Sequence, residues 1–283
     1  MQERRGVISV SSLIGRASGA LAALCVSLTA FAAPWRPLAP GVEVGEFTVP
    51  DAGEAVVTVV RVDPLQAGLS LHSARWEALD GWPTGPQWAE REHLLAGINA
   101  GMIEPDGRTT GFARQGDRTL NRHWVERYRA VLVAEPREAG LPALQLLDRE
   151  CDDVEAIAPK YGVVLQSLRM VDCHQKNAWQ VDSRQWSVAM LAVDGAGRLL
   201  LIHCRSPFTM HAFVDALLAL PLDLRRAMYL EGGPEATLVF DEGTRREIRI
   251  GSYETGFNEN DRVKVPWKLP NLLGVRRRAS TKP

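Results

Sequence analysis

Short apolar runs recur along this sequence, and turn residues separate them. Residues 55–62 are apolar and rich in β-branched side chains, and Asp63-Pro64 follows them at once. Residues 186–193 and 198–204 flank Asp194-Gly-Ala-Gly, a sequence typical of a β-hairpin. Runs this short suit strands. They predict one α+β domain that is rich in strands, with a mixed sheet and a few packed helices.

Two segments carry helix signals. Pro86 fits the first turn of a helix over 86–95. Ser206 and Pro207 fit the N-cap and first position of a second helix, over 206–220. The other expected segments are an irregular entry arm over 33–50 and strands over 69–73, 98–103, 111–120 (a hairpin), 130–134, 144–147, 161–167, 227–230 and 236–240.

The first 32 residues have the pattern of a secretory signal peptide. Three arginines precede an apolar stretch over 20–31, and Ala30 and Ala32 provide a small-residue cleavage site. The apolar stretch is short for a membrane span, although an uncleaved anchor is the alternative. We therefore expect an exported domain over 33–283, periplasmic or extracellular, with no stable membrane insertion after cleavage.

The charge balance argues against a nucleic-acid partner. Of the 283 residues 24% are charged, and the formal net charge is -1, so no overall field attracts polyanions. The one basic run, 276–278, is typical of a solvated tail.

Three cysteines follow the predicted signal peptide. An exported protein is expected to oxidise a suitably placed pair, but three thiols leave one over and the sequence does not decide which. Cys151 and Cys173 flank one segment and are the preferred pair, with Cys204 left over. No spacing typical of a structural zinc site is present.

An acidic residue stands at the end of an apolar run. Residues 227–230 resemble a buried strand, and Glu231, Gly232 and Gly233 follow them directly. A simple turn would more often contain Asn-Gly or Asp-Gly. A carboxylate beside two glycines, placed at a strand end, therefore suggests a site.

A second unit ends in a similar way. A predicted helix and short strand lead to Asn99-Ala100-Gly101, as the helix over 206–220 leads to Glu231. If this similarity is more than chance, the two polar ends meet in one cleft.

The order of these motifs resembles the phosphodiester glycosidase family over residues of about 55–275. The matching positions are Asn99-Ala100-Gly101-Met102, Arg184, Asp194-Gly195 and Glu231-Gly232-Gly233. Two departures stand out. The family has Asp where this chain has Glu231, and small hydroxyl residues where it has Pro234-Glu235.

The resemblance implies a hydrolase that removes a sugar from a sugar-1-phosphodiester, here on envelope glycans, with a glycan or phosphosugar as partner and no cofactor. Arginine matches the oxygens of phosphate, so Arg184 is the expected phosphate ligand and Arg205 the second candidate. Glu231 is the expected base or nucleophile, and Glu235 is a second acid within reach.

Smaller residues complete the expected site. Asn99 could orient a sugar hydroxyl. Gly101, Gly232 and Gly233 let backbone N–H groups approach a ligand. Ser167 lies where the family often has a Ser-Gly segment at the rim of the site, with leucine in place of the glycine.

Each of these residues also has a purely structural interpretation. Glu231 could cap a helix or pair with an arginine, Arg184 could be a surface residue, and Asn99 could satisfy buried backbone groups. For the whole chain, the alternative is an inactive glycan-binding module, which the Glu-Gly-Gly-Pro motif favours. A third hypothesis is a metal-dependent phosphodiesterase that uses Asp106, Asp194 and His203. No spacing in the sequence requires a metal, and a divalent ion is left open.

Overall fold

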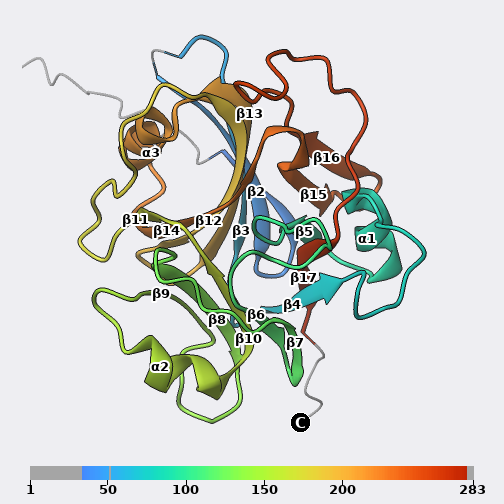
Figure 1. Cartoon of the computed structure of the whole chain (residues 1–283), viewed down its shortest axis with the longest axis vertical. Helices are drawn as coiled ribbons and strands as arrows, with labels where there is room; N and C mark the ends of the chain where they lie inside the picture. The colour runs from blue at the N-terminus through green and yellow to red at the C-terminus, as the bar shows by residue number, and fades with distance from the viewer. Residues whose placement is uncertain (1–33, 51, 279–283) are drawn as a thin grey trace, which may run out of the picture. The chain divides into compact units, whose positions relative to one another are not determined.

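The computed structural model describes residues 34–50 and 52–278, which form three antiparallel sheets with helices around them (Figure 1). Strands hold 45% of the described residues and helices 11%. All strand pairings within these ranges are antiparallel. The predicted strand-rich domain with a few helices is confirmed, but the domain is mainly β, so the α+β class and the mixed sheet are wrong.

The first sheet has seven strands. In spatial order they are β1 (Trp35–Ala39), β2 (Val42–Thr48), β3 (Val56–Val62), β13 (Leu199–Phe208), β12 (Trp186–Asp194), β14 (Leu224–Gly232) and β11 (Arg169–Val171). The segment over 33–50, expected to be irregular, thus supplies β1 and β2. Its prolines and glycines hide the alternation of Val42, Val44 and the residues that follow.

The other two sheets have five strands each. One has the order β7 (Arg118–Asn121), β6 (Ala113–Gln115), β10 (Tyr161–Ser167), β8 (Ala130–Pro136) and β9 (Leu144–Asp148). The other has the order β16 (Arg246–Ile250), β15 (Thr237–Asp241), β5 (Ala96–Asn99), β17 (Asn271–Arg277) and β4 (Ala67–Ser73). The basic run over 276–278 is therefore no free tail, because most of it belongs to β17 and Arg278 pairs with Glu135 at 3.3 Å.

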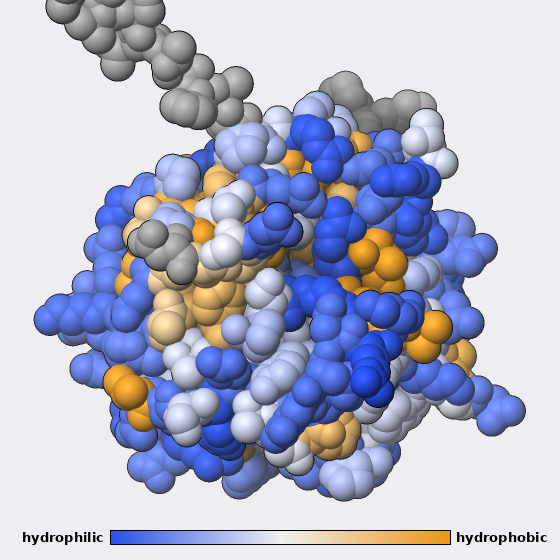
Figure 2. Space-filling model, turned by 90° about the horizontal axis from the view of Figure 1, so that it is seen from above, coloured by the Kyte–Doolittle hydropathy of each residue, from blue (hydrophilic) through white to orange (hydrophobic). Residues whose placement is uncertain are grey.

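One face of each sheet contributes to a shared core. Leu191 and Leu201 of the seven-stranded sheet pack there with Ile98 and with Leu132 and Leu165. Because neighbouring strand residues face opposite sides, Met190 and Ile202 turn to the other face of their sheet. On the outside, charged and polar side chains cover most of the surface in Figure 2, with scattered apolar patches.

A helix covers the second face of each sheet, and the three helices lie at separate corners of the molecule (Figure 1). Helix α3 (Met210–Ala219) buries Phe213 against the seven-stranded sheet. Helix α1 (Gly85–Arg91) buries Trp88 against the β15 sheet, and α2 (Val154–Ile157) buries Val154 against the β10 sheet.

Both predicted helices are shorter than expected. Helix α3 begins at Met210 because Thr209, not Ser206, is the N-cap and accepts a hydrogen bond from Ala212 N at 3.4 Å. Ser206 and Pro207 instead extend β13, whose Phe208 pairs with Trp186. Helix α1 ends at Arg91, and β5 starts at Ala96.

The preferred disulfide is present. Cys151 and Cys173 are bonded, with their Cα atoms 6.5 Å apart, and Cys204 is a buried free thiol. Burial raises the pKa of the Cys204 thiol to about 12. The signal peptide predicted at 1–32 lies outside the described residues. No helix within the described residues is long and apolar enough to cross a bilayer.

Candidate active site

Glu231 lies near the end of β14, opposite Ala189 of β12. Its Oε1 accepts a hydrogen bond from Gly232 N at 3.1 Å. The backbone N–H of Ile103 also points to this carboxyl group. Ile103 follows the Asn99-Ala100-Gly101 segment closely, so the two polar strand ends meet as the sequence suggested.

The surroundings of Glu231 favour its protonated form. Burial raises the pKa of Glu231 from 4.5 to about 8, and the nearby charges of Glu235 and Glu254 act in the same direction. The N–H groups of Gly232 and Ile103 oppose the rise without cancelling it. At neutral pH this carboxyl group therefore holds a proton, which suits a proton donor better than the expected base or nucleophile.

Glu235 and Glu254 complete a group of three acids, named here the acid cluster. Burial raises the pKa of both residues. The positive charge of Arg184 acts on Glu254 and lowers its pKa in part. Within the acid cluster, Glu254 is thus the residue whose ionised form is stabilised by a positive charge, that of Arg184.

The turn that joins β14 to β15 places Glu231 and Glu235. A three-residue 3-10 helix, Gly233–Glu235, makes this connection. Gly233 has φ +59°, and a Cβ on it would lie 2.6 Å from Oε2 of Glu254. Glycine is required here both for the backbone conformation and for the close approach of Glu254.

Gly232 is also needed for packing. A Cβ on Gly232 would overlap the Trp186 ring and lie 2.6 Å from the Tyr229 hydroxyl. The pKa of Tyr229 is raised well above 10 by burial and by the charge of Glu231. Trp179 packs against both aromatic residues, with ring centroids 5.3 Å from Tyr229 and 6.4 Å from Trp186. Three aromatic side chains, Trp179, Trp186 and Tyr229, thus pack together beside the acid cluster.

Glu254 comes from a loop that Ser187 and the predicted site residue Arg205 hold in place. Ser187 Oγ accepts hydrogen bonds from Ser252 N at 3.0 Å and Tyr253 N at 3.2 Å. Arg205 donates to Ile250 O at 2.7 Å and to Val263 O at 2.8 Å, and it also pairs with an aspartate of this loop. Arg205 therefore stabilises the loop that carries Glu254, and it does not belong to the acid cluster.

The side-chain amide of Asn99 uses its oxygen in a hydrogen bond within the protein, while its nitrogen has no partner in the part of the chain that the structure describes. Its Oδ1 accepts a hydrogen bond from Thr237 N at 3.0 Å, while its Nδ2 is buried without a partner among the described residues. Thr237 Oγ1 and Asn271 Oδ1, on neighbouring strands, are likewise buried and unpaired, and so is Ser167 Oγ. Buried polar atoms are normally satisfied, so these strand ends offer bonds to a water or a ligand hydroxyl.

Arg184 lies at the rim of the site. Its side chain is 68% exposed, it pairs weakly with Asp182 at 3.5 Å, and it stands over the Trp186 ring at 5.5 Å. Arg184 and Trp179 line a cavity of about 440 Å³. Gly101 has φ +79°, as the turn after β5 requires.

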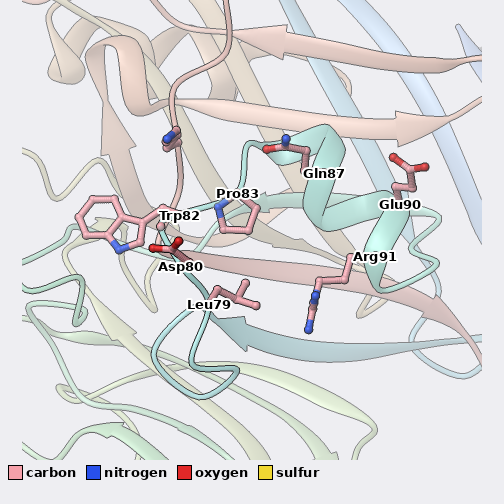
Figure 3. Close-up of a pocket in the computed structure, with 9 residues that line it drawn as sticks. Leu79, Asp80, Trp82, Pro83, Gln87, Glu90 and Arg91 are labelled. Atoms are coloured by element: carbon pink, nitrogen blue, oxygen red, sulfur yellow. The ribbon is translucent and has the colours of Figure 1, made fainter.

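Another cavity lies apart from all these residues. It has about 490 Å³ and is lined at α1 by Trp82, Gln87, Arg91 and their neighbours (Figure 3). None of the predicted site residues contributes to it.

The three candidate metal ligands have other partners. Asp194 pairs with Arg198 at 2.7 Å, Asp106 pairs with Arg108 at 2.7 Å, and buried His203 faces Ala236 O at 3.2 Å. Within 34–50 and 52–278, the potential ligands close enough to share one ion are Cys151, Cys173 and His174, whose two sulfurs form the disulfide.

Sequence reasoning missed three residues of the site. Tyr229 stands two positions before Glu231 on the same strand, so strand alternation could have found it. Trp179 and Glu254 lie in loops, and no pattern in the sequence places them here.

The chain is similar in sequence and fold to known proteins. The phosphodiester glycosidase family matches residues 92–276. The catalytic domain of zebrafish N-acetylglucosamine-1-phosphodiester alpha-N-acetylglucosaminidase, auto-inhibited by its pro-peptide, is 16% identical with a TM-score of 0.59, over 85% of each chain. A hypothetical protein from Synechocystis is 12% identical with a TM-score of 0.60, over 88% of this chain and 65% of that chain. No curated protein sequence matches. At these identities the structural likeness shows the fold.

Proposed function

Because this chain belongs to the phosphodiester glycosidase family, we propose that it hydrolyses a sugar-1-phosphodiester. The family supports glycosidase-type activity, and the substrate is our inference. The observation that carries it is the acid cluster, in which burial and the charges of Glu235 and Glu254 raise the pKa of Glu231 and the charge of Arg184 acts on Glu254. From the predicted signal peptide we further propose export and a substrate among envelope glycans.

The reaction replaces the phosphate on the anomeric carbon with water. A water molecule attacks this carbon and gives a proton to Glu254, and the bond from carbon to the phosphate oxygen breaks. The products are the free sugar and the phosphate monoester of the aglycone. Phosphate is a weak base, so it needs less help from an acid than an alcohol would.

The raised pKa of Glu231 serves this substrate in a second way. A phosphodiester carries a negative charge, and three ionised carboxylates would repel it. A neutral Glu231 removes one of these charges and donates a hydrogen bond or a proton to the phosphate oxygen instead. Glu235 adds a further acid to the same turn.

Arg184 and Asn99 orient the two halves of the substrate. The guanidinium of Arg184 is exposed and matches two phosphate oxygens. The unpaired Nδ2 of Asn99 can donate to a sugar hydroxyl. Substrate binding would then satisfy a buried donor.

Steady-state kinetics on a sugar-1-phosphodiester test this assignment. We expect Glu254→Gln to lower kcat by at least about a hundredfold, since general base help is worth that much. Glu231→Gln should lower kcat by less, because the phosphate leaving group needs less help from an acid. Arg184→Ala should mainly raise KM. Glu138→Gln, at an exposed site, is the control. Rates near wild type for all variants would refute the proposal.

The altered Glu-Gly-Gly-Pro motif supports one competing function. A glycan-binding module without activity would bind sugar phosphates, and Glu231→Gln would leave that binding intact. Turnover by the wild-type chain that depends on Glu231 would exclude it.

A further inference from the structure

We infer that the cavity beside the acid cluster binds an aglycone that carries a further phosphate group. This inference rests on the proposed function and names the class of substrate. Four arginines line the cavity of about 440 Å³, namely Arg127, Arg129, Arg169 and Arg184, and we call it the arginine cleft.

The arginine cleft is next to the acid cluster. Trp179 lines the cleft, and its ring is 5.3 Å from that of Tyr229, centroid to centroid. Tyr229 in turn lies close enough to Glu231 for the charge of that carboxylate to raise the pKa of the tyrosine. Arg184 belongs to the rim of both regions, because its charge acts on Glu254. A phosphodiester held at Arg184 therefore directs its aglycone into the cleft.

Two of the four arginines are free of acidic partners. Arg169 pairs with Asp148 at 2.9 Å and Glu150 at 2.6 Å, and Arg184 has Asp182 at 3.5 Å. For Arg127 and Arg129, no carboxylate lies within 4.0 Å in the described part of the chain. Their charges are therefore not neutralised within the protein.

The backbone presents Arg127 and Arg129 together. Both are exposed and both line the arginine cleft, while Tyr128 between them is buried. They also line an adjoining cavity of about 440 Å³, to which Glu126 contributes. Arg127 and Arg129 thus contribute to both cavities.

This arrangement fits phosphate better than a neutral aglycone. Guanidinium groups bind phosphate through paired hydrogen bonds, whereas a neutral group would leave Arg127 and Arg129 in water. The acid cluster repels a second phosphate, so the arginine cleft is the part of this region that attracts it. Selectivity for the aglycone then depends on Arg127 and Arg129.

Two substrates with the same sugar test the inference. One carries a neutral glycerol on the phosphodiester, and the other carries glycerol phosphate. We expect the ratio of kcat/KM for the phosphorylated over the neutral substrate to fall about tenfold in Arg127→Gln/Arg129→Gln, as two solvent-screened ionic contacts would give. Arg122→Gln, on the same segment outside the cleft, is the matched control and should keep the wild-type ratio. An unchanged ratio in the double variant would overturn the inference.

A binding measurement separates this inference from the proposed function. Calorimetric titration with inorganic tripolyphosphate at low salt should detect binding to the wild-type chain and to Arg122→Gln, and at least tenfold weaker binding to the double variant. If neither substrate is hydrolysed but this pattern is found, the proposed function fails and the phosphate site stands. If hydrolysis is found without any dependence on Arg127 and Arg129, the function stands and the inference fails.

Discussion

Replacing Glu231 by Gln should stabilise the protein at neutral pH. The pKa of Glu231 is about 8 in the folded chain against an ordinary 4.5. Between these values the unfolded chain loses this proton while the folded chain keeps it, so stability falls as pH rises. Glutamine resembles the protonated acid and does not titrate.

The size of the effect follows from the two pKa values. The cost of holding the proton is about 1 kcal/mol at pH 5 and about 3 kcal/mol at pH 7, because each full pKa unit is worth about 1.4 kcal/mol. The stability of Glu231→Gln relative to wild type should therefore increase by about 2 kcal/mol between pH 5 and pH 7. Without the Glu231 carboxyl group, Glu235 and Glu254 repel each other under altered conditions, which reduces the stability difference. Arg184 stays charged between pH 5 and pH 7, so it does not contribute to the change with pH.

Urea unfolding followed by tryptophan fluorescence measures this difference at pH 5, 6 and 7. Glu138→Gln, at an exposed position, controls for the loss of a surface carboxylate. The reasoning is refuted if the gain of Glu231→Gln over wild type is the same at pH 5 and pH 7, or if it decreases with pH.

Three other predictions concern the same residues and the disulfide. Catalysis should decline above a pH of about 8, where Glu231 loses its proton, and a pH–kcat profile that stays flat to pH 10 would contradict the assigned role. Gly232→Ala should cost about 2 kcal/mol, seen as a lower Tm, because its Cβ would overlap Trp186; an unchanged Tm would show that the site is looser than described. Replacing Cys151 and Cys173 by serine opens a loop with a separation of 22 residues and should cost about 3 kcal/mol in urea unfolding, whereas a loss below about 0.5 kcal/mol would mean that the unfolded chain gains little freedom.

The strands of the core could be predicted from sequence because local pattern and burial agree there. Residues 55–62 and the hairpin around Asp194 are examples, since their β-branched runs and turn residues need no distant partner. The start of α3 could not be predicted, because Ser206 and Thr209 are both good N-caps. The pairing of Phe208 with Trp186 decides between them, and that contact is long-range.

The candidate site divides in the same way. Glu231 and Asn99 could be found because each polar residue ends an apolar strand. Glu254 could not, because its place depends on the loop that Arg205 and Ser187 hold. The rise in the pKa of Glu231 could not be predicted from the sequence either, because it depends on burial and on the charges of Glu235 and Glu254.

The short connection between β14 and β15 has a consequence for how this site can evolve. Only the four residues 233–236 separate a strand of the seven-stranded sheet from a strand of the β15 sheet. Any shift between these two sheets must change the spacing between Glu231 and Glu235. Leu230 and Leu238 pack in the shared core on either side of the connection. We therefore expect substitutions at these leucines to change the distance between the two carboxyl groups and with it their pKa values. Substitutions at these two leucines can shift the pH at which activity is highest, although the residues that contact the substrate are unchanged.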